Sequence, residues 1–267
     1  MGQSVWEDVR LYELELHGYD DDLEFWAGLL DSHQPTTVLE LACGTGRITL
    51  PMAAKGSAEC DDFRIVGTDS SASFIARARE LLVAQSPAVQ QATRFLEGDM
   101  RDFDLGETFD LIVLGFNSFA YLHTIDDQLA CLECVRRHLA PNGRFVLDVI
   151  VPQFNFVAEA QVIPPVIRLE LNHPVPSAGI ERFLRSYTDR YDGATQTITT
   201  TYFYEIYHED GRQERVSKDL TWHMYFPHEL ELLLRMTGFA FEGRDGDYNG
   251  SPFTTRSKQY VWTMSAS

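Results

Sequence analysis

The chain has 267 residues, of which 44% are hydrophobic, enough for one large domain or for a domain with a subdomain. Its 40 acidic residues outnumber its 22 basic ones and give a net charge of −18, which argues against nucleic acids and anionic membranes as partners. No apolar run is long enough for a transmembrane helix, and the first residues lack the basic start and apolar core of a signal peptide, so we expect a cytoplasmic protein.

Residues 1–34 are predicted to form a helical lid. Three aspartates at positions 20–22 precede an apolar series, and negative charge at the N-terminus of a helix is favourable. Tyr12 and Tyr19 lie in the same segment. Their hydroxyls or ring faces could contact a bound ligand, although tyrosines that only pack the lid would need no function.

The most informative segment is residues 38–47, where a short apolar run leads into a glycine loop and the start of a helix. Three small residues keep the loop thin, so that its backbone can approach a ligand: Ala42, Gly44 and Gly46. Such a loop binds a dinucleotide or S-adenosylmethionine. A dinucleotide loop has a third glycine where this chain has Thr49, whereas Glu40 supplies the acid expected before the glycines of an adenosylmethionine site. A nicotinamide-dependent oxidoreductase is therefore the weaker alternative.

Two further predicted strands end in acidic residues. Residues 64–69 end in Asp69, where an open α/β sheet places the carboxylate that binds ribose hydroxyls. Residues 95–100 end in Asp99 and Met100, an acid and a large apolar side chain suited to an adenine amine and to the face of its ring. Both strand ends thus fit the adenosyl part of the ligand.

The alternation of strands and helices continues to residue 150. Strands are predicted at residues 109–117 and 141–148, a helix at residues 73–82 and a linker at residues 85–93. Such alternation over residues 35–150 predicts a parallel sheet.

Residues 151–224 break this pattern. Prolines mark an irregular entry, and four β-rich runs follow at residues 166–171, 181–191, 197–208 and 212–224. Asp-Gly pairs at residues 192–193 and 210–211 separate the later runs, which indicates hairpins. We therefore expect a small antiparallel sheet, a β cap inserted after the fifth core strand.

Residues 225–267 are expected to complete the core. Pro227 and Gly238 bracket a predicted helix, with proline in its first turn and glycine after its end. Two strands, at about residues 240–245 and 259–264, are predicted to form a terminal antiparallel hairpin.

Together these motifs resemble those of class I S-adenosylmethionine-dependent methyltransferases. The resemblance covers roughly residues 35–150 and 226–265 and rests on E-L-A-C-G-T-G-R, V-G-T-D, G-D-M-R-D-F and F-D-L-I-V, in this order. Within that superfamily the chain is similar to bacterial small-molecule methyltransferases, including glycine and amino-sugar N-methyltransferases. The resemblance implies a Rossmann-like sheet, a tyrosine-bearing lid, and a cap that covers the active site and can form the interface of a homodimer.

The predicted cofactor is S-adenosylmethionine. Glu40, the glycine loop and Arg47 are expected to hold its methionine end, with Arg47 a candidate for the carboxylate. The complete predicted set is Glu40, Ala42, Gly44, Gly46, Arg47, Asp69, Ser70, Asp99, Met100, Gly115 and Phe116. Ala42 stands where many members of the family have glycine, and alanine is small enough for the loop.

Methyl transfer from a sulfonium needs alignment more than acid or base catalysis, so this class has no obligatory catalytic motif. Candidates lie in the lid and after the later strands: Tyr12, Tyr19, Asn117, Tyr121, His123, Asp148 and Tyr225. Asp148 could bind or deprotonate an acceptor, or it could only order the turn after its strand. His123 could serve as a base, although histidines that only order a loop are more common.

No metal is expected, because Cys131 and Cys134 lie in a helical pattern without a second cysteine pair. The favoured function is methyl transfer to a small molecule, preferably to an amine nitrogen. Transfer to carbon or oxygen of a small aromatic metabolite is an alternative, as is a non-catalytic protein that only binds adenosylmethionine.

Overall fold

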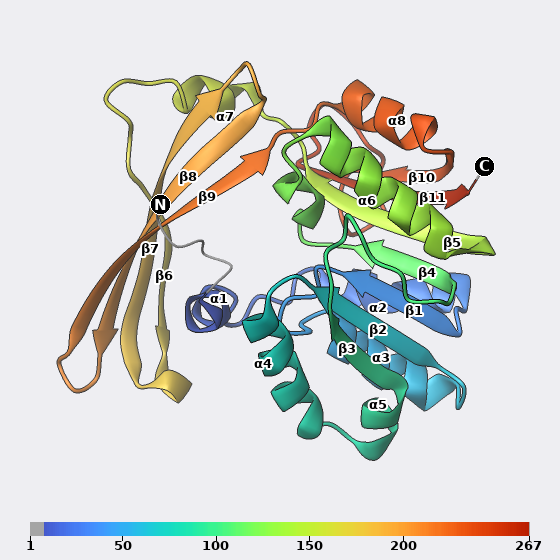
Figure 1. The fold of residues 1–267 in the computed structure, drawn as a ribbon. Coiled ribbons are helices and arrows are strands. Elements are labelled where there is room, and N and C mark those ends of the chain that lie inside the picture. Colours follow the sequence, from blue (N-terminus) through green and yellow to red (C-terminus); the bar gives the residue numbers. More distant parts are fainter. Residues whose placement is uncertain (1–7, 267) are drawn as a thin grey trace. The chain divides into compact units, whose positions relative to one another are not determined.

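The computed structural model describes residues 8–266 (Figure 1). The contacts within the chain divide it into two compact units. The sheet unit comprises the described residues up to Tyr19 together with Pro152–Met224, and the core unit comprises Asp20–Val151 together with the chain from Tyr225 onward. The segment predicted as one lid is thus shared, because its first helix belongs to the sheet unit and its second to the core unit.

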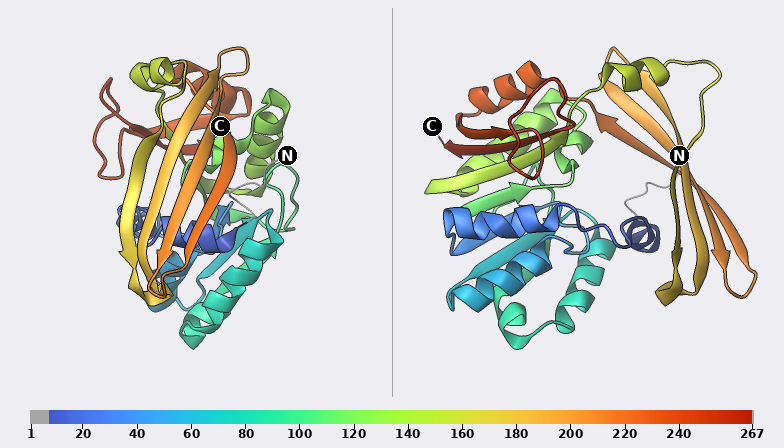
Figure 2. Two further views of the ribbon diagram at one scale, coloured as in Figure 1. Left: turned by 90° about the vertical axis from the view of Figure 1, so that its left-hand side faces the viewer. Right: turned by 180° about the vertical axis from the view of Figure 1, so that it is seen from behind.

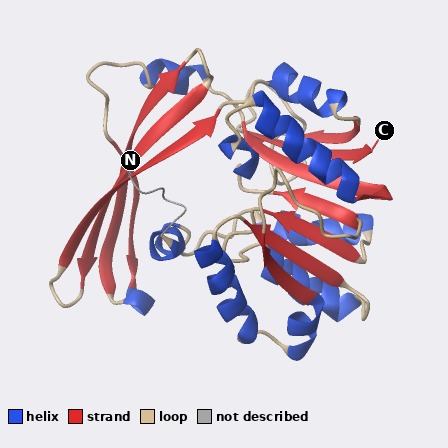
Figure 3. Ribbon diagram, viewed as in Figure 1, coloured by secondary structure: helices blue, strands red, loops and turns tan. Residues whose placement is uncertain are grey.

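The core unit is built on a seven-stranded sheet with the order β10-β11-β5-β4-β1-β2-β3 (Figure 3). Its strands are β1 (Thr37–Leu41), β2 (Arg64–Asp69), β3 (Thr93–Glu97), β4 (Phe109–Leu114), β5 (Leu139–Ile150), β10 (Phe239–Asp245) and β11 (Gln259–Ala266). Neighbours among β1 to β5 are parallel, whereas β11 is antiparallel to β5 and β10 is antiparallel to β11. The predicted α/β class, its parallel core and its terminal antiparallel hairpin are confirmed.

Helices cover both faces of this sheet, which explains why its central strands are continuous apolar runs. The helices of the core unit are α2 (Leu23–His33), α3 (Thr49–Glu59), α4 (Ala72–Val83), α5 (Pro87–Ala92), α6 (Ile125–His138) and α8 (Pro227–Met236). Helices α2 and α3 lie on one face and α6 on the other (Figures 1 and 2). Trp26, Met52 and Leu111 belong to one buried cluster that joins α2 and α3 to the sheet.

Residues 85–93, predicted as a linker, contain the short helix α5, so that prediction was wrong. Pro87 occupies the first turn of α5, and the Ser86 hydroxyl accepts a hydrogen bond from the backbone N–H of Val89. Serine followed by proline is a helix-start signal, but the helix is too short to show an apolar periodicity.

The sheet unit contains a four-stranded antiparallel sheet with the order β6-β7-β8-β9. Its strands are β6 (Arg168–Val175), β7 (Ile180–Asp192), β8 (Thr197–His208) and β9 (Gln213–His223), and its helices are α1 (Val9–Glu15) and α7 (Phe154–Glu159). Leu11 and Leu14 of α1 pack in one buried cluster with Phe183, Tyr204 and Ile206. No helix within residues 8–266 is both long and apolar enough to cross a membrane.

Candidate functional site

The loop between β1 and α3 has an unusual backbone. Ala42, Gly44 and Gly46 have φ angles of 53°, 57° and 85°, so left-handed residues alternate with ordinary ones. A Cβ atom at Gly46 would lie 2.7 Å from Cζ of Phe95, which excludes any side chain there. Ala42 is the one non-glycine residue among the three, and its Cβ atom makes the left-handed conformation strained at that position.

Glu40, at the end of β1, is buried beneath this loop. Its carboxylate accepts a hydrogen bond from the hydroxyl of Thr49. Burial raises the pKa of Glu40 to about 8, although Thr49 and the charge of Arg47 act in the opposite direction. Thr49, which departs from the dinucleotide pattern, therefore has a partner of its own. A buried carboxylate with a raised pKa is suited to a cationic ligand, which would stabilise its ionised form.

Asp69, at the end of β2, ties the glycine loop to the second strand. One carboxylate oxygen accepts from the N–H of Gly44 at 2.9 Å and the other from the N–H of Ser71 at 2.8 Å. Burial raises the pKa of Asp69, and these two hydrogen bonds lower it. Each oxygen keeps a second lone pair, which ribose hydroxyls can use. Ser70, also in the predicted site, is exposed.

Asp99 lies beyond the end of β3 beside a guanidinium that the sequence analysis did not anticipate. Arg101 Nε and Nη2 lie 2.9 and 2.5 Å from its two carboxylate oxygens, and Arg101 also pairs with Asp127 at 2.8 Å. These hydrogen bonds lower the pKa of Asp99, so its carboxylate is an ionised acceptor. Met100 is half-buried next to it. The nearby sequence G-D-M-R-D contained the signal, because an arginine two residues after an aspartate can fold back onto it.

Arg47 makes a bidentate ion pair inside the core unit. Its two terminal nitrogens lie 2.7 Å from the two carboxylate oxygens of Asp22, which is fully buried. Trp26 Nε1 donates to the same carboxylate at 3.0 Å. Arg47 also lies over the ring of Phe116, with 4.9 Å between Cζ and the ring centroid. The expected contact of Arg47 with a ligand carboxylate stays a prediction, while its contact with Asp22 is direct.

The turn after β4 is held in a strained conformation. Phe116 and Asn117 are consecutive non-glycine residues with φ angles of 56° and 58°. Asn117 Oδ1 accepts from the N–H of Ile150 at 2.9 Å, which stabilises the turn from the neighbouring strand. At Gly115 a Cβ atom would lie 2.8 Å from Cζ2 of Trp26. Backbone strain that the surroundings enforce is characteristic of functional sites.

Asp148 of β5 is fully buried beneath that turn. Its carboxylate accepts from the hydroxyl of Tyr248 at 2.7 Å and from Nε2 of Gln259 at 2.6 Å, and the N–H of Asn117 points to it at 3.4 Å. Burial raises its pKa to about 6, and Asp22 raises it further. Tyr248 and Gln259 lie 100 and 111 residues away along the chain, so no local pattern in the sequence links them to Asp148.

The other predicted catalytic residues come from both units. Tyr225 is fully buried, and its hydroxyl donates to the backbone carbonyls of Phe119 and Leu122 at 3.3 and 3.2 Å. Tyr121 is half-buried at the end of a short 3₁₀ helix, and His123 is exposed. The two remaining candidates, Tyr12 and Tyr19, belong to the sheet unit. The predicted cofactor residues, Asn117 and Asp148 therefore all belong to the core unit.

Comparisons with known proteins agree with this geometry. Residues 38–143 match the family model described as a methyltransferase domain. The chain is 29% identical to the cypemycin N-terminal methyltransferase of a Streptomyces species, over 97% of this chain and 96% of that one. It is an S-adenosylmethionine-dependent methyltransferase. Its predicted class, enzymatic nature and cofactor are thereby confirmed.

Further relatives and solved structures are similar to this chain. A dTDP-4-amino-2,3,4,6-tetradeoxy-D-glucose N,N-dimethyltransferase of Saccharopolyspora spinosa is 33% identical over 42% of this methyltransferase and 39% of its own length. The CcbJ methyltransferase of Streptomyces caelestis has a TM-score of 0.77 at 20% identity, over 99% and 98% of the two chains. The adenosylmethionine-bound amino pentose methyltransferase CalS10 of Micromonospora echinaspora has a TM-score of 0.68 at 21% identity, over 95% and 96%. These solved structures share the fold of this enzyme.

Proposed function

We propose that this methyltransferase transfers the methyl group of S-adenosylmethionine to an amine nitrogen of a small acceptor. The observation that carries the proposal is the kind of acceptor in the names of its relatives. The relative that aligns over nearly the whole chain is named an N-terminal methyltransferase, and three others are named N,N-dimethyltransferases of amino sugars. The amino-sugar relatives align over only about half of this chain or less, so the sugar itself is not proposed as the acceptor.

The residues of the core unit fit this cofactor. Glu40 offers a buried carboxylate to a ligand that carries a sulfonium and an ammonium, and Asp69 offers two acceptor oxygens to a diol. Between them the glycine loop leaves no room for a side chain at Gly46. We propose that Asp99 and Met100 take the adenine amine and ring. These carboxylates and their apolar partner match a cationic nucleoside better than a pyrophosphate.

When bound, adenosylmethionine supplies a methyl group that is already activated by the sulfonium. The chain then has to hold a neutral amine in line with that group and keep water out, and alignment of this kind is worth on the order of 7–11 kcal/mol. We propose that the turn at Phe116 and Asn117 helps to position the acceptor. Asp148 is fully buried and holds the N–H of Asn117, so we assign it a positioning role rather than that of an indispensable base.

We propose further that the sheet unit contributes to acceptor recognition and to a homodimer. Strand β6 is at an edge of its sheet and exposes Leu169, and residues before it expose Ile163 and Ile167. An edge strand with exposed apolar side chains favours association with another chain. A cytoplasmic location accords with the four free cysteines, Cys43, Cys60, Cys131 and Cys134.

Methylation assays with isotopically labelled adenosylmethionine test the acceptor atom. The purified enzyme would be offered peptides with a free N-terminus, amino-sugar nucleotides, and phenols or catechols. We expect label on nitrogen, identified by NMR of the product, and no label when the peptide amine is acetylated. A product with its new bond to carbon or oxygen would overturn the proposal and favour the alternative of an aromatic acceptor.

A further inference from the structure

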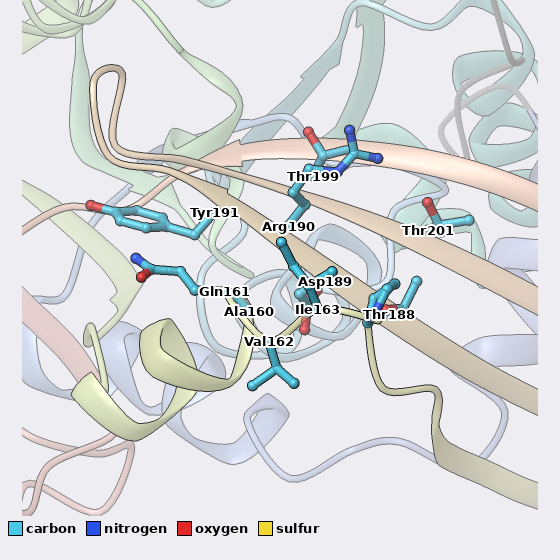
Figure 4. A pocket seen from close by; sticks show the side chains of 11 residues that line it. Ala160, Gln161, Val162, Ile163, Thr188, Asp189, Arg190, Tyr191, Thr199 and Thr201 are labelled. Carbon is cyan, nitrogen blue, oxygen red and sulfur yellow. The ribbon is translucent and has the colours of Figure 1, made fainter.

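The sheet unit contains a pocket of about 420 Å³ that the cofactor site does not use. Its lining comes from the segment before β6 and from strands β7 and β8 (Figure 4). One wall is apolar and includes Ala160, Val162 and Ile163, while the other is polar and includes Thr188, Asp189 and Thr201. A small ligand with one apolar and one polar end would match both walls.

The pocket lies where β7 becomes an edge strand. The pairing of β6 with β7 begins at Arg168 and Tyr187, so residues 188–191 have only β8 as a neighbour in the sheet. Residues 160–165 line the pocket beside this open edge. A missing strand thus leaves space next to polar side chains of β7.

Asp189 is the chemical centre of this pocket. It is only 7% exposed, and one carboxylate oxygen accepts from the hydroxyl of Thr200 at 2.6 Å. Trp222 Nε1 donates to that hydroxyl at 3.2 Å and so fixes its direction. The other carboxylate oxygen is buried and has no hydrogen-bond partner among the described residues. The hydroxyl of Thr188 is also buried and unpaired among the described residues, but it lies on the opposite face of the strand. Unpaired buried polar atoms are costly, so they mark a place where a partner is expected.

Two of the neighbouring arginines are already engaged in ion pairs. Arg168 pairs with Glu159 at 2.9 Å. Arg185 pairs with Glu15 at 2.6 Å and with Glu170 at 2.9 Å. Arg190 lines the pocket with an exposed side chain. The buried carboxylate therefore has no fixed counter-ion among the described residues.

We propose that this pocket binds a protonated aliphatic amine, with the ammonium on Asp189 and the carbon chain against Val162 and Ile163. An ammonium supplies the hydrogen-bond donors and the positive charge that the unpaired oxygen lacks. An anion would meet a buried carboxylate, and a neutral alcohol would supply a donor without charge. The site depends on residues of the sheet unit alone, so it stands whichever atom the enzyme methylates.

Titration of the whole isotope-labelled protein by NMR tests the site. The probes are n-butylammonium chloride, n-butanol and sodium butyrate at equal ionic strength, and the readout is the backbone amide shifts of residues 160–163 and 188–191. We expect butylammonium to bind at least about tenfold more tightly than butanol, because a charged hydrogen bond is lost with the alcohol. Butyrate should produce no saturable shift in these residues.

Asp189→Asn is the decisive variant, because asparagine has nearly the same shape and can still accept from Thr200. It should abolish the preference for butylammonium over butanol. Asp192→Asn is the matched control, since Asp192 is an exposed aspartate of the same strand whose carboxylate only accepts from the N–H of Ala194. Equal binding of butylammonium and butanol to the wild type, or no binding of either, would mean that the pocket holds only solvent, and the proposal would be wrong. Retention of the preference in Asp189→Asn would overturn it as well.

Discussion

Glu40 shows how a single residue links burial to cofactor chemistry. Burial raises its pKa to about 8, so the carboxyl holds a proton at neutral pH when no cation is present. A cationic ligand favours the ionised form, so binding must displace that proton. Below pH 8 the proton therefore competes with the ligand, and the affinity for adenosylmethionine is expected to rise with pH toward that value.

This pH dependence can be measured by calorimetry between pH 6 and 9. Titrations in buffers with different ionisation enthalpies would report the proton released on binding. Because the amino group of the ligand also titrates, the diagnostic is the difference between the wild type and Glu40→Gln. We expect the wild type to release more protons than the variant below pH 8 and the two to converge above it. Equal proton release throughout would show that Glu40 is already ionised in the free enzyme.

Asp22 forms a buried ion pair that the sequence did not predict. The sequence predicts only one of three acids at a helix start, yet Asp22 is fully buried and binds both terminal nitrogens of Arg47. Replacing one partner of a buried ion pair leaves the other charge unpaired and typically costs about 3–5 kcal/mol. Asp22→Asn should therefore lower the free energy of unfolding by a large part of that amount.

Chemical denaturation of the two variants Asp22→Asn and Asp21→Asn tests this expectation. Asp21 is the adjacent aspartate and is exposed, so its substitution removes the same charge without breaking the ion pair. The Asp21→Asn protein should unfold within about 0.5 kcal/mol of the wild type, as surface substitutions usually do. If both variants unfold alike, the Asp22–Arg47 pair contributes no net stability.

At the scale of elements, the core strands could be predicted because their apolar runs and glycine punctuation are local. Strand β2 begins and ends where the sequence placed it, and β8 coincides with the predicted run at residues 197–208. Strand β6 lies later than predicted, at Arg168–Val175, because proline does not exclude an edge strand and its partner β7 sets the register.

The sequence predicts that the proposed cofactor residues lie together for a related reason, since parallel strands end at one edge of the sheet. The contacts that hold Asp148 and Arg47 in place could not be predicted from the sequence. The hydrogen bond of Gln259 to Asp148 depends on the pairing of β11 with β5, and that of Tyr248 comes from the segment between β10 and β11. The ion pair of Arg47 likewise depends on how α2 packs near the glycine loop, and neither contact leaves a periodic signal in the chain.

The glycine loop gives an element-scale prediction. Gly46→Ala should prevent adenosylmethionine binding, because its φ angle of 85° is unfavourable for alanine and its Cβ would lie 2.7 Å from the ring of Phe95. Gly106→Ala is the control, since Gly106 also has a positive φ angle but a Cβ atom there would meet nothing within 4 Å. Isothermal titration with both folded variants separates backbone strain from steric overlap. Wild-type affinity in Gly46→Ala would show that the loop adapts to a side chain.

At the scale of the whole molecule, the net charge of −18 bears on the acceptor. A strongly acidic protein attracts cations over distances that salt screens, and the Debye length falls from about 10 Å at 0.1 M to about 3 Å at 1 M salt. If the acceptor is an amine on a cationic molecule, its KM should increase with salt concentration. The KM of an anionic acceptor should fall as the salt concentration increases.

A pair of peptide acceptors with the same free N-terminus isolates this effect. One peptide would carry lysine and the other glutamate at a position remote from the amine, and initial rates would be measured from 0.1 to 1 M KCl. We expect the KM of the lysine peptide to rise several-fold and that of the glutamate peptide to stay constant or fall, because only the long-range field distinguishes them. The kcat of both should change little, since alignment at the methyl group does not depend on the remote charge. Parallel salt responses would mean that the acidic surface serves solubility and has no part in acceptor selection.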